Sequence, residues 1–189
     1  MRKKHKEKDK RGIFLVLFIA LIMLTSTIGY VFKENSNEKY NGFSFSIGED
    51  QRWHTKINGI QMSFKYFPAD LEAINLSANI VDKIKTTNMI YFTHDLKNRY
   101  SGDIALLKEV FWPYFHIYAE IGLTEENDFG LSLIDCTNAT SAAPVMYITE
   151  SNQTGFYMDN NCITCEINSG EDFIAVEERL LYSLFGVME

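Results

Sequence analysis

Cys136, Cys162 and Cys165 are the residues of this chain with the most recognisable chemistry. The last two form a CxxC motif, the spacing of thioredoxin-like thiol oxidoreductases. In those enzymes the motif begins a helix, whose amide dipoles lower the pKa of a thiol. Here it continues into Glu166 and Ile167 with the alternation of a strand. Positions i and i+3 of a strand lie about 10 Å apart, too far for a disulfide.

A structural disulfide therefore explains the cysteines better than redox chemistry does. We expect Cys136 to pair with Cys162, or alternatively with Cys165, and the third thiol to be a small buried residue. A bridge to Cys162 closes a loop of about 25 residues and stabilises the fold by about 3 kcal/mol. No metal or cofactor is expected, because three cysteines without a nearby histidine do not complete a tetrahedral zinc site.

A second set of reactive side chains follows two predicted strands. His94 and Asp95 come after an apolar strand at residues 89–93, and Asp135 and Cys136 end another strand. Because the carboxyl ends of strands are where sites are commonly built, a hydrolase could use Cys136 as nucleophile and His94 as base. An oxidised Cys136 would lose that role, and an ordinary exit from strand to loop explains His94 and Asp95 as well.

Three N-glycosylation sequons begin at Asn75, Asn138 and Asn152, and all lie beyond the apolar N-terminal segment. Asn75 is expected on the polar face of a helix, where a glycan is tolerated. Three-residue patterns also arise by chance, so modification is a hypothesis.

Aromatic residues are frequent, and most of them must fill the core. If a group is exposed, Trp112 and Tyr114, on either side of Pro113, form the expected contact surface. Trp and Tyr supply a large contact area at a low entropy cost. The alternative is that this helix simply packs on the sheet.

The elements that must position these residues begin with three strands. Alternating apolar residues predict strands at 43–47, 53–57 and 60–66, and Asn58-Gly59 is the hairpin signal between the last two. A helix is expected from Pro68, because apolar residues then recur at three- and four-residue steps, namely at Leu71, Ile74, Ala78, Val81 and Ile84.

Two more helices and four more strands complete the expected order. A helix from Ser101 should bury Ile104, Leu107, Phe111, Tyr114 and Tyr118 and kink or restart at Pro113. A last helix at about 170–185 has Ser169 and Asp172 as a capping box, buries a stripe and ends near Gly186. The stripe comprises Phe173, Val176, Leu180 and Leu184. The strands are expected at 89–93, 131–136, 144–149 and 162–167.

This order predicts an α+β or α/β fold in which one mixed β-sheet is flanked by about three helices. Residues 41–189 should form one domain. At about 150 residues, it is large enough to bury about two thirds of its unfolded surface.

The N-terminal segment predicts a membrane anchor. Residues 1–12 hold seven basic and two acidic groups, and residues 13–32 carry no charge. As a helix that run is about 30 Å long, which matches the hydrocarbon core of a bilayer. Because the charges of its other flank balance, we expect residues 1–12 to be a cytoplasmic tail and residues 13–32 a single-pass transmembrane helix. The polar linker 33–40 and the domain 41–189 should be extracytoplasmic.

Two other interpretations of this segment stay open. A cleaved signal peptide is suggested by the short apolar stretch at 13–24, although no convincing small-residue cleavage site follows. A pilin-like subunit is suggested by Arg11-Gly12 before the apolar run, although Leu17 stands where a pilin carries glutamate.

The charge of the exported part limits its partners. Subtracting the tail's net +5 from the −7 of the whole chain leaves −12 on residues 33–189. Such a domain repels phosphate backbones and anionic headgroups, which argues against nucleic acid and against a second membrane contact. No motif indicates a small-molecule ligand.

Residues 40–187 resemble a group of small membrane-anchored proteins of uncharacterised archaea. The resemblance implies an archaeal source and an exported domain, and it adds nothing on activity because the motifs carry no known chemistry. They are YNGFSF at 40–45, INGIQMSFKYFP at 57–68, CTNATSAAPVMYI at 136–148, NCI at 161–163 and ERLLYSLFGV at 178–187.

The function that these observations favour is a membrane-anchored binding or assembly module that contacts another envelope protein. Its rivals are an envelope enzyme, either a thiol oxidoreductase using Cys162 and Cys165 or a hydrolase using His94 and Asp95, and a pilin-like subunit. No paired carboxylates, phosphate-binding loop or metal-ligand set rises above chance, so an enzyme is the weaker hypothesis.

Overall fold

The structure, a computed structural model, describes residues 18–23, 37–168, 170 and 172–189. Residues 18–23 are helical, and the rest of the predicted transmembrane helix 13–32 lies outside the described residues, as do the tail 1–12 and residues 33–36. No helix within the described residues is long and apolar enough to cross a bilayer.

A small antiparallel sheet begins the folded part. Its strands follow one another in the order β1-β2-β3-β4, with bounds Glu38–Tyr40, Phe43–Ile47, Trp53–Ile57 and Ile60–Phe64. The β3–β4 hairpin is confirmed, because Asn58 and Gly59 both adopt positive φ, 51° and 86°, as a two-residue hairpin turn requires. Strand β1 occupies the last three residues of the segment 33–40, which the sequence predicts to be a linker.

A larger mixed sheet follows, in the order β7-β6-β5-β8-β10-β9. All its neighbouring strands are parallel except β9 and β10. The apolar strand expected at 89–93 is β5, and it lies in the middle of this sheet. The bounds are Met89–His94 for β5, Tyr118–Leu123 for β6, Ser132–Leu133 for β7, Val145–Ser151 for β8, Gly155–Asp159 for β9 and Cys162–Asn168 for β10.

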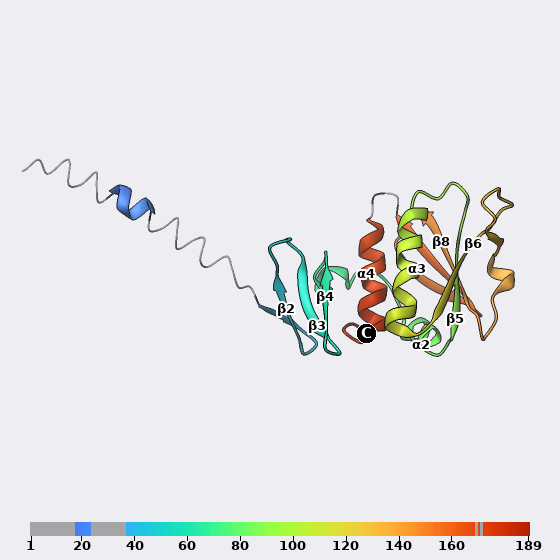
Figure 1. Cartoon of the computed structure of the whole chain (residues 1–189), viewed down its shortest axis with the longest axis horizontal. Helices are drawn as coiled ribbons and strands as arrows, with labels where there is room; N and C mark the ends of the chain where they lie inside the picture. Colours follow the sequence, from blue (N-terminus) through green and yellow to red (C-terminus); the bar gives the residue numbers. More distant parts are fainter. Residues whose placement is uncertain (1–17, 24–36, 169, 171) are drawn as a thin grey trace, which may run out of the picture.

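Helices α2 (Ala78–Lys85), α3 (Ser101–Phe115) and α4 (Phe173–Leu184) lie between the two sheets (Figure 1). The last helix is buried on nearly all sides because the small sheet covers one face and the other elements cover the rest. Its Tyr182 is fully buried, with its ring centroid 4.1 Å from that of Phe64 in β4. The predicted core stripe of α4 is confirmed, as is the part of the α3 stripe at Ile104, Leu107 and Phe111.

The expectation of a single mixed sheet was wrong, although the α+β class is confirmed. Alternation along a strand indicates which face is buried, but it does not say which strands pair. Here α4 separates β4 from the large sheet. The carboxylate of Glu178 on α4 accepts hydrogen bonds from the amides of Lys65 and Tyr66, just after β4.

The helix predicted from Pro68 to about Ile84 is broken in two. A 3₁₀ turn spans Pro68–Leu71, and α2 begins only at Ala78, which is exposed. Between them Asn75 forms a β-bridge with Gly155, and the amide of Phe156 donates to its carbonyl at 2.7 Å. This tertiary contact outweighs the helical periodicity, so Asn75 is not on the face of a helix.

The sequence also missed β1, β6 and β9 and misplaced some boundaries. Tyr118 belongs to β6, because His116 takes a left-handed conformation (φ 58°) and ends α3. Helix α3 continues through Pro113 to Phe115 rather than restarting. Cys136 begins a 3₁₀ turn, Cys136–Asn138, rather than ending a strand. Asp172 is the N-cap of α4 and accepts from the amide of Ile174, and Ser169 lies outside the described residues.

Candidate functional site

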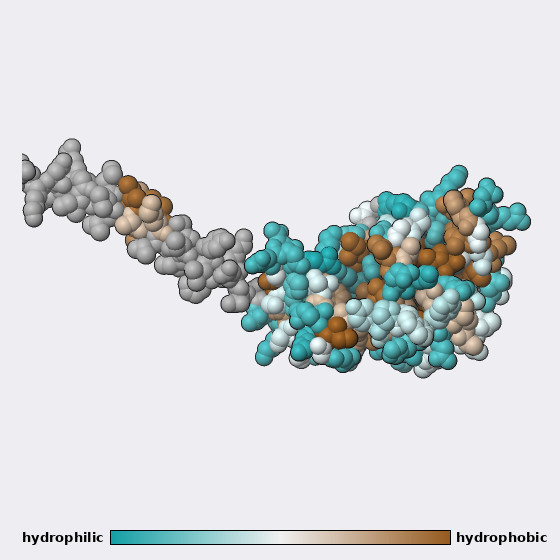
Figure 2. All heavy atoms as spheres, in the orientation of Figure 1, coloured by the Kyte–Doolittle hydropathy of each residue, from teal (hydrophilic) through white to brown (hydrophobic). Residues whose placement is uncertain are grey.

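A groove lies between the small sheet and the two long helices. Its volume is about 370 Å³. Hydrophobic atoms are visible at the surface between the small sheet and α3 (Figure 2). The groove is lined by one residue before β3, four residues of β4, four residues of α3 and five residues on or next to α4. They are Arg52, residues 61–64, Asp103, Leu106, Val110, Tyr114, Ile174, Glu177, Glu178, Leu181 and Phe185.

The helices line this groove because each has a second apolar stripe. Leu106, Val110 and Tyr114 recur at four-residue steps beside the buried stripe of α3. Leu106 is 68% exposed and Tyr114 40% exposed, since no element of the described structure covers that side of α3. On α4 the corresponding stripe includes Ile174, Leu181 and the adjacent Phe185.

The third wall is an open strand edge. In the described structure β4 pairs only with β3, and Ile57 and Ile60 flank the two-residue turn as a pair. In an antiparallel ladder, hydrogen-bonded and non-hydrogen-bonded pairs alternate. The backbone groups of Gln61 and Ser63 therefore point away from β3. Arg52 lies along this edge and donates to the Ser63 hydroxyl at 3.0 Å and to its carbonyl at 3.4 Å.

Glu178 is a fully partnered carboxylate at one end of the groove. Its side chain is only 5% exposed, and its oxygens accept from the amides of Lys65 at 2.6 Å and Tyr66 at 2.8 Å. Arg52 adds an ion pair at 3.5 Å. Burial raises the pKa of Glu178, and these three donors act against that rise. The carboxylate thus takes the place of a neighbouring strand at the end of β4.

Glu177 is its unpartnered neighbour. In the described part of the chain, no donor forms a hydrogen bond or ion pair with its partly buried carboxylate. Burial, helped by the negative charges of Glu178 and Asp103, raises the pKa of Glu177 to about 7. Arg52, the cation that opposes this rise, is already bonded to Ser63 and Glu178.

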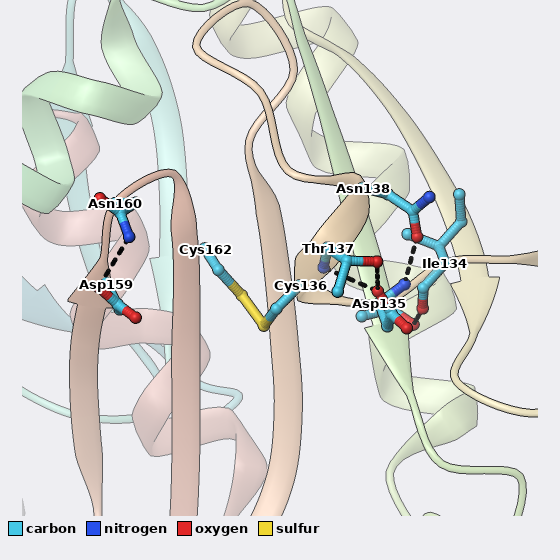
Figure 3. Close-up of a disulfide and its surroundings, with 9 residues drawn as sticks. Ile134, Asp135, Cys136, Thr137, Asn138, Asp159, Asn160 and Cys162 are labelled. Atoms are coloured by element: carbon cyan, nitrogen blue, oxygen red, sulfur yellow. Dashed lines mark hydrogen bonds between the residues drawn. A yellow bond between two sulfur atoms is a disulfide. The ribbon is translucent and has the colours of Figure 1, made fainter.

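The three cysteines lie outside the groove. Cys136 and Cys162 are joined in a disulfide, the pairing placed first by the sequence, with Cα atoms 5.3 Å apart (Figure 3). Cys162 and Cys165 lie on β10, so the CxxC motif is extended as expected. Cys165 is a free, buried thiol whose pKa is raised by burial. These cysteines therefore provide no exposed dithiol.

His94 and Asp95 lie at the carboxyl end of β5, but neither lines the groove. His94 is 4% exposed, and its Nδ1 contacts the carbonyl of Asp95 at 2.8 Å. The Asp95 carboxylate accepts from the hydroxyls of Thr124 at 2.6 Å and Tyr147 at 3.0 Å. Cys136 is bonded to Cys162, so no free thiol joins this pair.

The three sequon asparagines are all exposed, in different settings. Asn75 lies in the bridge to Gly155, and its side chain donates to Phe156 at 3.4 Å. The Asn138 side chain accepts from the amide of Asp135 at 2.8 Å, within the turn shown in Figure 3. Asn152 lies in the turn between β8 and β9.

Trp112 and Tyr114 are both exposed, but they line different hollows. Residues two apart on a helix point about 200° apart, so only Tyr114 faces the groove. Trp112, 61% exposed, lines a shallow hollow with Tyr118 on the other side of α3. The two aromatics do not form one surface.

Sequence reasoning missed Arg52, Glu177 and Glu178 as groove residues. The usable signal was the second apolar stripe on each of the two helices, since a helix buried on one side needs only one stripe. No protein-family model, no curated protein and no solved structure matches this chain.

Proposed function

We propose that the chain is a membrane-anchored, extracytoplasmic binding or assembly module, and that its groove binds an extended segment of a partner polypeptide as an added strand beside β4. The observation that supports this is the open edge of β4, which forms one wall of the groove. Strand addition is a general mode of peptide recognition: main-chain hydrogen bonds supply affinity and side-chain pockets supply specificity.

The dimensions of the groove suit such a segment. From Asp103 to Tyr114 the wall formed by α3 is about 16 Å long, the length of about five residues of extended chain. An added strand would bring its inward side chains onto Leu106, Val110 and Leu181, all of which line the groove. A volume of 370 Å³ is in the range of ordinary ligand pockets.

The enzymatic alternatives have weaker support. A thiol oxidoreductase needs an accessible CxxC dithiol, whereas Cys162 is bonded to Cys136 and Cys165 is buried. A hydrolase at His94 needs a nucleophile within reach, and the buried imidazole contacts a backbone carbonyl instead. A pilin-like subunit rests on residues before 18, outside the described part.

Site-specific crosslinking tests the groove. A photoreactive amino acid replaces Leu106 in the full-length chain in its own membranes, and Gln61→Pro removes one amide from the open edge. Proline is tolerated on an edge strand, so the fold should survive. A partner should crosslink, Gln61→Ala should retain the adduct and Gln61→Pro should lose it. An adduct that is equally strong in both variants would exclude strand addition.

The anchor and its orientation have a separate test. We expect the chain to stay in the membrane fraction after a carbonate wash, and protease added outside intact cells should digest residues 37–189. A soluble form that begins near Gly29 would show cleavage instead.

A further inference from the structure

On the basis of the proposed strand addition, we further propose that the bound segment carries a lysine or arginine that pairs with Glu177, with apolar side chains at alternate positions beside it. The partner is thus an extended, basic and apolar stretch of polypeptide. Two features of the groove support this proposal. One is the carboxylate of Glu177, and the other is the spacing of the apolar side chains along the groove wall.

The charge argument compares two consecutive glutamates of α4. Glu178 has three donors, whereas Glu177 has none among the described residues. The charged groups that act on Glu177 are Glu178, Asp103 and Asp172, which are negative, and Arg52. Since Arg52 is bonded to Ser63 and Glu178, a cation from outside would supply the missing partner. An acidic segment would be repelled.

The spacing argument follows from the geometry of helix and strand. Along α4, Leu181 lies about 6 Å and Phe185 about 12 Å beyond Glu177. In a strand that runs along the helix, positions i+2 and i+4 lie about 7 Å and 13 Å beyond position i. A cation at Glu177 therefore places the next two inward side chains beside Leu181 and Phe185. The exposed Leu106 on α3 forms the facing wall.

Three nine-residue peptides test this proposal against the full chain in detergent. They share leucine at alternate positions and threonine between, and the central residue is lysine, norleucine or glutamate, so that either strand direction presents the same pattern. The lysine peptide should bind about tenfold more tightly than the norleucine peptide at pH 8, and the glutamate peptide more weakly than both. Amide signals of Gln61 and Ser63 report strand addition.

Matched variants identify the carboxylate responsible. Glu177→Gln should reduce the affinity of the lysine peptide to that of the norleucine peptide, whereas Glu166→Gln, on the far side of the large sheet, should preserve the tenfold preference. Lowering the pH from 8 to 6 should weaken only the lysine peptide, because Glu177 then takes up a proton.

The outcomes separate this inference from the proposed function. Equal affinity for the lysine and norleucine peptides, with shifted amide signals of Gln61 and Ser63, would contradict the proposed cationic partner of Glu177. Strand addition would still be supported. No binding by any peptide would overturn both. A dimer of the free chain that Gln61→Pro dissociates would assign the groove to a second copy and overturn the basic partner.

Discussion

The large sheet, with its disulfide, and the groove beside the small sheet differ in how completely their reactive side chains are partnered. In the first, Cys136 is bonded to Cys162 where β10 begins, and Thr124 and Tyr147 donate to Asp95 at the opposite, carboxyl end of the parallel strands. At the second, the edge of β4 is open and Glu177 has no donor in the described structure. The residue types with recognisable chemistry are in the large sheet, and the unpartnered groups are at the groove.

The largest effect should come from removing the disulfide. Cys136→Ser should lower the free energy of unfolding by about 3 kcal/mol, because the unfolded chain loses a closed loop of about 25 residues. Cys162→Ser should match it, and Cys165→Ala should cost only about 1 kcal/mol as a small core deletion. Guanidinium unfolding measures all three.

Non-reducing peptide maps provide the check on the bonding itself. They should link Cys136 to Cys162 and show Cys165 alkylated only after unfolding. A reversible Cys162–Cys165 bond would contradict the structural role of these cysteines and make the thiol oxidoreductase the favoured hypothesis.

At the groove, two neighbouring glutamates should respond differently. Glu178→Gln should cost about 2 kcal/mol at pH 8, because Lys65 and Tyr66 donate to different oxygens of the carboxylate and the substitution turns one of these buried acceptors into a donor. Glu177→Gln removes an unpartnered charge and should not destabilise. Urea unfolding of both variants is the measurement, and equal losses would contradict the assignment of donors.

The pH dependence of the free energy of unfolding should reveal the titration of Glu177. The folded-state pKa of Glu177, about 7, lies above its ordinary 4.5, so the folded chain binds more protons than the unfolded chain between these values. Its contribution to the free energy of unfolding therefore falls as the pH rises from 4.5 to 7. The loss is about 1 to 2 kcal/mol once solvent screening of this partly exposed group is allowed for.

Comparing unfolding at pH 5 and pH 8 in the wild type and in Glu177→Gln isolates that contribution. The variant should lose less stability over this interval. Identical pH slopes would show that Glu177 titrates normally.

The smallest effect on stability should come from the groove wall. Leu106→Ser should change the free energy of unfolding by less than about 0.5 kcal/mol, because the side chain is 68% exposed. The same change should weaken binding of the lysine peptide. A loss of more than about 1 kcal/mol in stability, with binding unchanged, would make Leu106 a packing residue and remove it from the binding surface.

Elements with strong local signals were predicted well. The β3–β4 hairpin follows from Asn58-Gly59, and the core faces of α3 and α4 follow from their periodicity. The helix expected at 68–84 failed because the bridge between Asn75 and Gly155 joins residues that are distant in sequence. The candidate site also depends on contacts between residues that are distant in sequence. The sequence analysis therefore named Tyr114 but not Glu177.

By itself, the sequence determined local geometry: where turns fall, which helix face is buried, and that the CxxC motif is extended. These follow from backbone preferences and side-chain periodicity, which act within a few residues. Only the tertiary structure decided that α4 separates two sheets, that β4 keeps an open edge, and that Glu178 is partnered while Glu177 is not. Those outcomes depend on which strand edges and hydrogen-bond donors lie close together in the folded chain. Two adjacent glutamates can therefore have different surroundings.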